Sequence, residues 1–317
     1  MSLERPAAAS ALPSLADIAS GGKRAVARAL SAIETRRGSA ELAALLDTAT
    51  AAPRGFVLGL TGPPGVGKST LTNALVRRAR ARGETVAVVA VDPSSRRTGG
   101  ALLGDRARIQ TDPEDTGVFV RSMAARDRLG GLSDETVAAV ALLRALYDLV
   151  IVESVGIGQS EADIAFAADT VVLCIQPGSG DSLQFMKAGV MELPDIVVVT
   201  KADMADAARR AQADVEGALS LVPGSGWRAP VLALSAARGS GLEGLEAAIL
   251  RHRDYLREDG RLAEKRAAQA AQWSEEAIRA RFGRAGLALA RTLPVPPGGP
   301  FAREAALGAE LERRLRG

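Results

Sequence analysis

A glycine-rich segment that contains a lysine and two hydroxyl side chains carries the clearest chemical signal in the chain. Its residues, between the apolar run 56–60 and a helical pattern near 68–82, are Gly62, Pro63, Pro64, Gly65, Val66, Gly67, Lys68, Ser69 and Thr70. Backbone N–H groups of such a loop, with the positive end of the next helix, hold an anion. Lys68 supplies a charge for the β- and γ-phosphates, and the Ser69 hydroxyl is placed to bind Mg²⁺. The order of strand, loop, lysine, hydroxyl and helix predicts a nucleoside triphosphate site rather than a chance glycine-rich turn.

A second segment is suited to recognising the base. The apolar run 195–199 is followed by Thr200, Lys201, Ala202 and Asp203. A carboxylate here accepts two hydrogen bonds from guanine, whereas adenine offers no matching pair of donors. We expect the hydroxyl of Thr200, which stands where the usual guanine motif has Asn or Thr, to tie this segment to the phosphate loop.

The alternative interpretation of this segment is a surface Lys-x-Asp turn. The stretch after the run 230–234 agrees with the functional interpretation, because its backbone amides could contact the guanine oxygen. It consists of Ser235, Ala236 and Ala237. The sequence therefore favours GTP over ATP.

Acidic residues end two other apolar runs. Glu153 follows the run 149–152, where a carboxylate meets Mg²⁺ directly or through water, and the N–H of Gly156 can approach the γ-phosphate. Gln159 is a candidate for positioning the attacking water. Because it lies three residues beyond Gly156, an exposed polar loop residue is the alternative.

Asp92 follows the run 85–91 and opens a glycine-rich loop that reaches Asp105. Its carboxylate could bind Mg²⁺ or orient the attacking water, and the alternative is an Asp-Pro turn initiator. Asp105 could approach the same ion if the loop folds back. The predicted metal ligands are Ser69, Asp92, Asp105 and Glu153, and the predicted catalytic residues are Lys68, Asp92 and Gln159.

These residues must be positioned by alternating strands and helices. Apolar runs occur at 56–60, 85–91, 149–152, 170–175, 195–199 and 230–234, and helical patterns near 68–82, 134–147, 161–168, 206–221 and 242–257. Continuous rather than alternating apolar runs are typical of strands covered by helices on both faces. They predict an α/β fold with a doubly wound, mostly parallel sheet.

Helical patterns without strands flank this region. Two or three short helices are expected within residues 14–52, and charged helices at 260–282 and 301–316. The expected organisation is a helical extension over 1–52, a nucleotide-binding domain over 53–257 and a helical tail over 258–317.

The composition narrows the classes of partner. The charge of +3 comes from 40 basic and 37 acidic residues, and aromatics make up only 3%, which disfavours nucleic-acid binding. The single cysteine, Cys174, lies in an apolar run and is expected to be buried. One cysteine suits a reducing cytoplasm, and no run reaches membrane-spanning length. We therefore expect a cytoplasmic protein without a membrane or nucleic-acid partner.

Three further segments carry a resemblance. They are Val-Asp-Pro-Ser-Ser-Arg-Arg-Thr-Gly-Gly from residue 91, Glu-Ser-Val-Gly-Ile-Gly-Gln-Ser-Glu from residue 153 and Gln-Pro-Gly-Ser-Gly-Asp from residue 176. With the phosphate loop, they resemble the MeaB/ArgK family over roughly residues 20–257. Members are G-protein chaperones of adenosylcobalamin-dependent acyl-CoA mutases, typified by methylmalonyl-CoA mutase.

The resemblance implies a homodimeric P-loop GTPase of the signal-recognition/MinD class. Such a protein hydrolyses GTP slowly and uses the cycle to gate cofactor delivery to the mutase and to protect it. It also implies that Lys68 and Ser69 hold phosphate and Mg²⁺, that Asp203 reads guanine, and that segment 177–189 signals to the partner.

Three alternatives stand beside this interpretation, and the composition argues against the second. The same family has been labelled a kinase associated with a basic amino-acid transport system. A GTPase that inserts nickel would need clusters of His or Cys, whereas this chain has only His252 and Cys174. The third alternative is a nucleotide-dependent scaffold in which hydrolysis is incidental.

Overall fold

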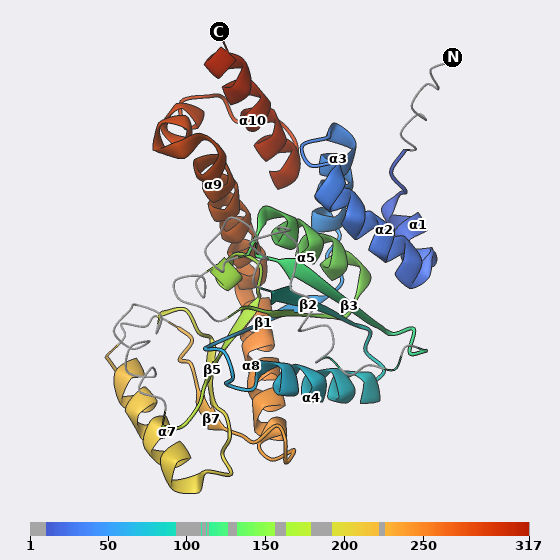
Figure 1. Ribbon diagram of the computed structural model, residues 1–317. Helices are drawn as coiled ribbons and strands as arrows, with labels where there is room; N and C mark the ends of the chain where they lie inside the picture. Colours follow the sequence, from blue (N-terminus) through green and yellow to red (C-terminus); the bar gives the residue numbers. More distant parts are fainter. Residues whose placement is uncertain are drawn as a thin grey trace, which may run out of the picture. The chain divides into compact units, whose positions relative to one another are not determined.

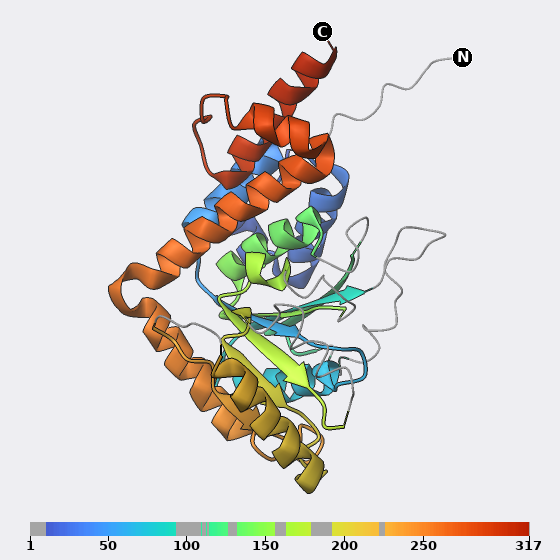
Figure 2. The same ribbon diagram turned by 90° about the vertical axis from the view of Figure 1, so that its left-hand side faces the viewer.

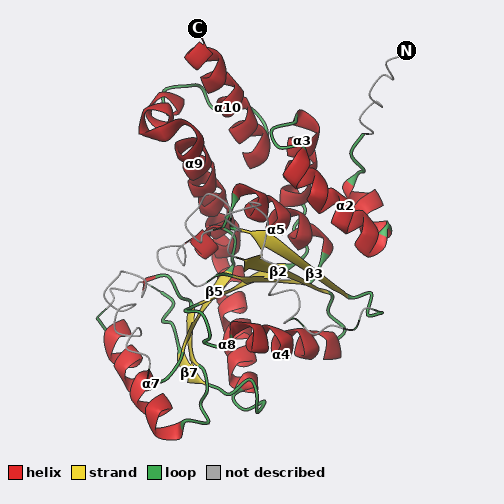
Figure 3. Ribbon diagram, viewed as in Figure 1, coloured by secondary structure: helices red, strands yellow, loops and turns green. Residues whose placement is uncertain are grey.

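The computed structural model describes residues 11–92, 109, 112, 114–125, 132–155, 163–178, 192–221 and 226–316. The chain divides into two compact units. The first comprises Met1–Ala52 and Ile278–Gly317, and the second comprises Pro53–Ala277. In Figures 1 and 3 the described part of the first unit consists of helices joined by loops, whereas the second unit contains the sheet.

The described part of the second unit contains a seven-stranded sheet with the order β3-β2-β4-β1-β5-β6-β7. Its strands are β1 (Phe56–Thr61), β2 (Val86–Asp92), β3 (Val118–Ala124), β4 (Leu149–Glu153), β5 (Thr170–Ile175), β6 (Ile196–Val199) and β7 (Val231–Ala233). All neighbouring strands pair in parallel. The carboxyl ends of all strands therefore lie at one edge, with β1 between β4 and β5.

Helices cover both faces of this sheet, which confirms the predicted doubly wound fold. They are α4 (Lys68–Ala81), α5 (Asp134–Leu146), α7 (Ala205–Leu219) and α8 (Leu242–Arg257). Figure 2 shows α4 and α5 on opposite sides of the sheet. Leu71 and Leu75 of α4 and Leu245 of α8 belong to the apolar core on one face. Strands β1, β2, β5 and β6 are buried along their whole length, as continuous apolar runs require.

The sequence analysis missed one strand and was wrong about one helix. Strand β3 was not predicted, because its sequence Val-Phe-Val-Arg-Ser-Met-Ala mixes apolar and polar residues. It is an edge strand with four half-buried positions, so the pattern of a fully covered strand does not apply. The helix predicted over 161–168 is only a short 3₁₀ segment at residues 163–166, and residues 161–162 lie outside the described part.

The described part of the helical unit contains three N-terminal helices, within the two or three expected, and helices from the C-terminal region. The N-terminal helices are α1 (Leu15–Ser20), α2 (Gly22–Thr35) and α3 (Ala40–Ala51). Helix α9 (Arg261–Ala290) starts in the sheet unit and departs from helical geometry at Gly283, whose φ is 70°. Helix α10 (Pro300–Arg316) is capped by the Asp47 carboxylate, which accepts the Phe301 N–H at 2.9 Å and the Ala302 N–H at 3.1 Å. An anion at a helix N-terminus is stabilised by the exposed N–H groups.

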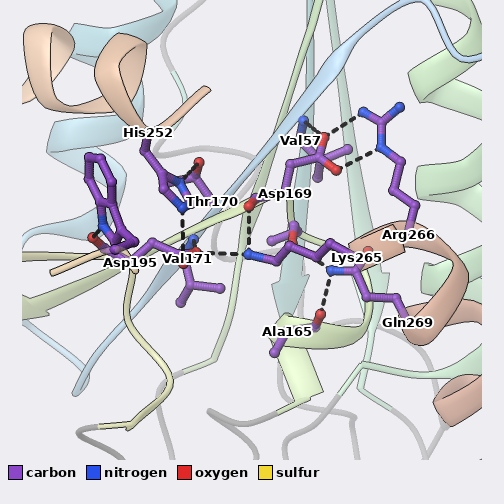
Figure 4. A network of polar contacts seen from close by, with 12 residues as sticks. Val57, Ala165, Asp169, Thr170, Val171, Asp195, His252, Lys265, Arg266 and Gln269 are labelled. Atoms are coloured by element: carbon purple, nitrogen blue, oxygen red, sulfur yellow. Dashed lines mark hydrogen bonds and ion pairs between the residues drawn. The ribbon is translucent and has the colours of Figure 1, made fainter. Parts of the chain in front are cut away.

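A polar network at the amino edge of the sheet joins α8 and the start of α9 to the strands (Figure 4). The Asp169 carboxylate accepts two bonds from Arg266, at 2.7 and 2.8 Å, and one from the Val57 N–H at 2.8 Å. The Asp195 carboxylate lies 3.2 Å from His252 Nε2 and 3.1 Å from Lys265 Nζ. These contacts lie at the edge of the sheet opposite the phosphate loop. Their position favours a structural role.

Burial lowers the pKa of His252 to about 4. The ring is therefore neutral at pH 7, and its Nδ1 lies 2.7 Å from the Thr170 hydroxyl. Within the described residues, no helix combines the length and apolar character needed to cross a membrane.

Candidate nucleotide-binding site

The phosphate loop follows β1 and adopts backbone angles that favour glycine. The φ angles of Gly62, Gly65 and Gly67 are 130°, 75° and 103°. At Gly62 a Cβ atom would lie 2.1 Å from the carbonyl oxygen of Cys174 on β5, so that position excludes any side chain. Gly67 is the N-cap of α4 and provides no side-chain cap. The positive end of this helix is therefore directed toward an incoming anion.

The ammonium group of Lys68 lies within the curve of the loop. Its Nζ donates to the carbonyl oxygens of Gly62 at 2.7 Å and Pro63 at 3.1 Å, and the residue is buried. A buried charge needs such partners. The loop thus holds a positive charge beside its own backbone, which is the arrangement that phosphate oxygens require.

The carboxylate of Glu153, at the end of β4, holds the first turn of α4. It accepts the Ser69 hydroxyl at 2.7 Å and the Thr72 hydroxyl at 2.9 Å, and it is almost completely buried. Because the Ser69 proton is directed to Glu153, the lone pairs of Ser69 Oγ remain available to a cation. Glu153 therefore orients the predicted metal ligand Ser69, an arrangement that fits a carboxylate acting on Mg²⁺ at one remove.

A cavity of ≈ 300 Å³ lies over these groups. Its lining comprises Pro64, Gly65, Gly67, Lys68, Ser69, Thr70, Asn73, Glu153, Ser154 and Val155. Asn73, Ser154 and Val155 were not predicted. Asn73 could have been found from its position one turn beyond Ser69 on the same helix face. Ser154 follows the carboxylate directly, and its hydroxyl donates to the Thr61 hydroxyl at 2.9 Å.

Asp92 ends β2 at the same edge of the sheet and is 1% exposed. The register pairs Ala90 with Glu153, so Asp92 lies two residues farther along on the same face of the sheet. Asp105, Gly156 and Gln159 lie outside the described residues. In the described part of the chain, no three His, Cys, Asp or Glu residues gather as metal ligands. The role of Asp92 toward a metal or water stays a prediction.

The segment predicted to read the base contacts the phosphate loop. Thr200 Oγ1 donates to the carbonyl of Val66 at 2.8 Å and lies 3.0 Å from the carbonyl of Ile175. The predicted tie between the two loops is therefore confirmed. The Ala202 N–H donates to the Leu234 carbonyl at 3.0 Å, which brings this segment beside residues 235–237.

Asp203 is exposed, and a hydrogen bond from the Ser235 side chain is the main cause that lowers its pKa. The carboxylate is therefore ionised at neutral pH and ready to accept hydrogen bonds. Cys174, as expected, is fully buried, and burial raises the pKa of its thiol to about 12. The thiol is therefore protonated and unreactive at neutral pH.

A phosphate loop after the central strand of a parallel sheet, with a carboxylate at the next strand end, defines a P-loop nucleotide-binding protein. The model of the family described as methylmalonyl Co-A mutase-associated GTPase MeaB matches residues 26–286. The chain belongs to this family and is a P-loop GTPase that binds GTP and GDP.

Relatives agree with this assignment. A protein of Pyrococcus horikoshii named as a GTPase is 44% identical over 251 residues, which is 78% of each chain. The GTPase ArgK of Escherichia coli is 38% identical over 68% of this chain and 67% of its own. The mouse protein named methylmalonic aciduria type A homolog, mitochondrial, is 37% identical over 226 residues, which cover 70% of this chain and 54% of the mouse protein.

Among solved structures, one described as an LAO/AO transport system kinase superimposes with a TM-score of 0.67. It is 26% identical, and the match covers 96% of both chains. The match therefore includes residues of both units.

Proposed function

We propose that this GTPase is Mg²⁺-dependent and serves as a chaperone that gates cofactor loading and protection of an adenosylcobalamin-dependent acyl-CoA mutase. The observation that carries the nucleotide part of the proposal is the arrangement of Lys68, Ser69 and Glu153 around one cavity. The mutase part is supported by membership in a family described as mutase-associated GTPases and by the name of the mouse relative.

The residues present fit a magnesium ion. Ser69 offers a hydroxyl oxygen whose proton is committed to Glu153 at 2.7 Å, and oxygen donors are the ligands that this ion prefers. Asp92 supplies a second carboxylate at the same sheet edge. A bound Mg²⁺ would neutralise phosphate charge. In this proposal Ser69 binds the ion, Glu153 orients Ser69, and Asp92 binds the ion or orients water.

Asp203 is the proposed guanine reader. Its ionised carboxylate is held by Ser235 at the rim of the site, where it can accept both guanine donors. An adenine ring would leave this carboxylate without donors, which costs affinity. Ala236 and Ala237 are proposed to contact the guanine oxygen through their backbone, and Lys201 to cover the base.

A titration with GTP, GDP and ATP in the presence of Mg²⁺ tests the nucleotide part. The wild type should bind GTP far better than ATP. Asp203→Ala should lose this preference but still bind both nucleotides through their triphosphate groups. Ser235→Ala is the matched variant, because it removes the support of the carboxylate but not the carboxylate itself. Equal binding of GTP and ATP by the wild type would contradict the assignment of Asp203.

The partner part needs its own experiment. Purified adenosylcobalamin-dependent acyl-CoA mutases should form a complex with the protein and raise its GTP turnover. Light scattering should give the mass of a homodimer for the free protein. If no mutase of this class binds or changes the rate, the chaperone role is wrong even where GTP hydrolysis is intact.

A second candidate function is suggested by the description of the solved neighbour as a transport system kinase. A kinase would transfer the γ-phosphate to a protein hydroxyl, whereas a hydrolase releases inorganic phosphate. Incubation with labelled GTP or ATP and a binding protein of a basic amino-acid transport system separates the two. Stable label on the protein would favour the kinase, and free phosphate alone would favour the hydrolase.

A further inference from the structure

Lys201 has an uncommon backbone conformation. Its φ is 53°, and among the described non-glycine residues only Asp259 shares a positive φ. For a lysine this left-handed conformation is unfavourable and persists only where the surroundings fix it. They do so here, because the Thr200 N–H donates to the Ile175 carbonyl at 2.8 Å and the Met204 N–H to the Lys201 carbonyl at 2.9 Å. These two bonds therefore fix a sharp backbone turn at Lys201, between Thr200 and Asp203.

The side chain of Lys201 is also held, although the residue is exposed. Its Nζ donates to Gln176 Oε1 at 2.6 Å. Gln176 is half-buried and directly follows β5. An exposed ammonium is fully solvated by water, so such a bond adds little stability. Its effect is to restrict a side chain that has several rotatable bonds.

The position of this bond relates it to the nucleotide site. The register pairs Ile175 with Val199, so Gln176 and Thr200 begin the two loops that leave neighbouring strands. Thr200 uses its hydroxyl to hold Val66 of the phosphate loop. The next residue, Lys201, uses its amine to hold Gln176. The bonds of Thr200 and Lys201 thus hold the base-reading segment both to the phosphate loop and to the end of β5.

We propose that Gln176 is a positioning residue for guanine nucleotides. The Gln176 side chain holds Lys201 in one conformation before the nucleotide binds. The methylene groups of Lys201 then form a wall of the base site beside Asp203. Gln176 itself contacts neither phosphate nor metal in this proposal. The inference rests on the proposed role of residues 200–203 in reading the base.

The proposal predicts a specific pattern of binding. Gln176→Ala should weaken GTP and GDP equally, by about threefold to tenfold, because the free side chain of Lys201 must be ordered during binding. Turnover at saturating GTP should not change, since the phosphates are held elsewhere. Gln176→Glu keeps an oxygen acceptor for Lys201 and should restore the affinity.

A double-mutant cycle with Lys201→Met separates positioning from general structure. Lys201→Met keeps most of the stem and removes the amine, so adding Gln176→Ala to it should cause no further loss of GDP affinity. Independent losses from the two changes would overturn the proposal, as would an unchanged affinity of Gln176→Ala. Thermal unfolding of each variant checks folding.

The cycle also distinguishes this inference from the proposed function. If the wild type binds ATP as well as GTP, the guanine assignment fails, and coupling between residues 176 and 201 can still be measured with either nucleotide. If the wild type prefers GTP but the coupling is absent, only the role of Gln176 fails.

Discussion

Replacing Thr200 with valine removes one hydroxyl group from the junction of the base-reading segment and the phosphate loop, with almost no change in volume. The residue is 4% exposed, and its Oγ1 donates to the Val66 carbonyl at 2.8 Å. The Ile175 carbonyl keeps its bond from the Thr200 N–H at 2.8 Å. The carbonyl of Val66, in the phosphate loop, is therefore the group that loses a donor.

The expected cost follows from the burial of this bond. A hydrogen bond adds about 0.5–1.5 kcal/mol net, and a buried acceptor left without a donor costs about 1–3 kcal/mol. We therefore expect the free energy of unfolding to fall by about 1–3 kcal/mol. In a domain of this size that lowers the midpoint of thermal unfolding by roughly 2–10 °C. The affinity for GDP should also fall, because the phosphate loop loses the hydrogen bond that fixes the Val66 carbonyl.

Thermal unfolding with and without GDP measures both effects. Thr200→Ser is the matched control, because it keeps the hydroxyl group that donates to Val66 and loses only the methyl group. It should retain most of the stability and affinity that Thr200→Val loses. The reasoning is refuted if Thr200→Val unfolds at the wild-type temperature with the same GDP affinity, or if serine is as damaging as valine.

Two further predictions concern charge. Lys68→Met should reduce GTP turnover by roughly 10²–10³-fold, since it removes a preorganised positive charge from the phosphates; a variant with wild-type turnover would contradict the role of Lys68. Because burial holds the pKa of His252 at about 4, below its usual 6.5, the unfolded chain takes up this proton first as the pH falls. Stability should therefore decline between pH 6.5 and 4 by up to about 3 kcal/mol from this group. Urea unfolding at pH 7.5 and 4.5 should show a smaller loss in His252→Gln than in the wild type, and equal losses would exclude His252 as the cause.

The parts of the fold and site that the sequence predicts are those encoded within short segments. The phosphate loop needs glycines at fixed positions before a helix. The three loop glycines with positive φ, Gly62, Gly65 and Gly67, lie within six consecutive residues. Strands covered on both faces appear as uninterrupted apolar runs, which is why β1, β2, β5 and β6 were found. The tie from Thr200 to the phosphate loop was found because the guanine motif itself links these two segments.

The parts that the sequence does not reveal depend on pairing between distant segments. The bond from Ser69 to Glu153 joins residues 84 positions apart, and only the register of β4 beside β1 brings them together. Edge strand β3 lacks the uninterrupted apolar pattern because helices do not cover it fully. The bond between Lys201 and Gln176 spans two loops that start on separate strands. No local pattern in either segment predicts it.

The end of β5 explains why the separate motifs form one site. This strand pairs with β1, which carries the phosphate loop, and with β6, which carries the base-reading segment. Its Cys174 carbonyl lies against Gly62, its Ile175 carbonyl accepts the Thr200 N–H, and Gln176 accepts Lys201. Three consecutive residues thus set the spacing between the phosphate loop and the base-reading segment. A shift of β5 along its neighbours would disturb the contacts of both segments at once, so the register of β5 couples the position of the phosphate loop to that of the base-reading segment.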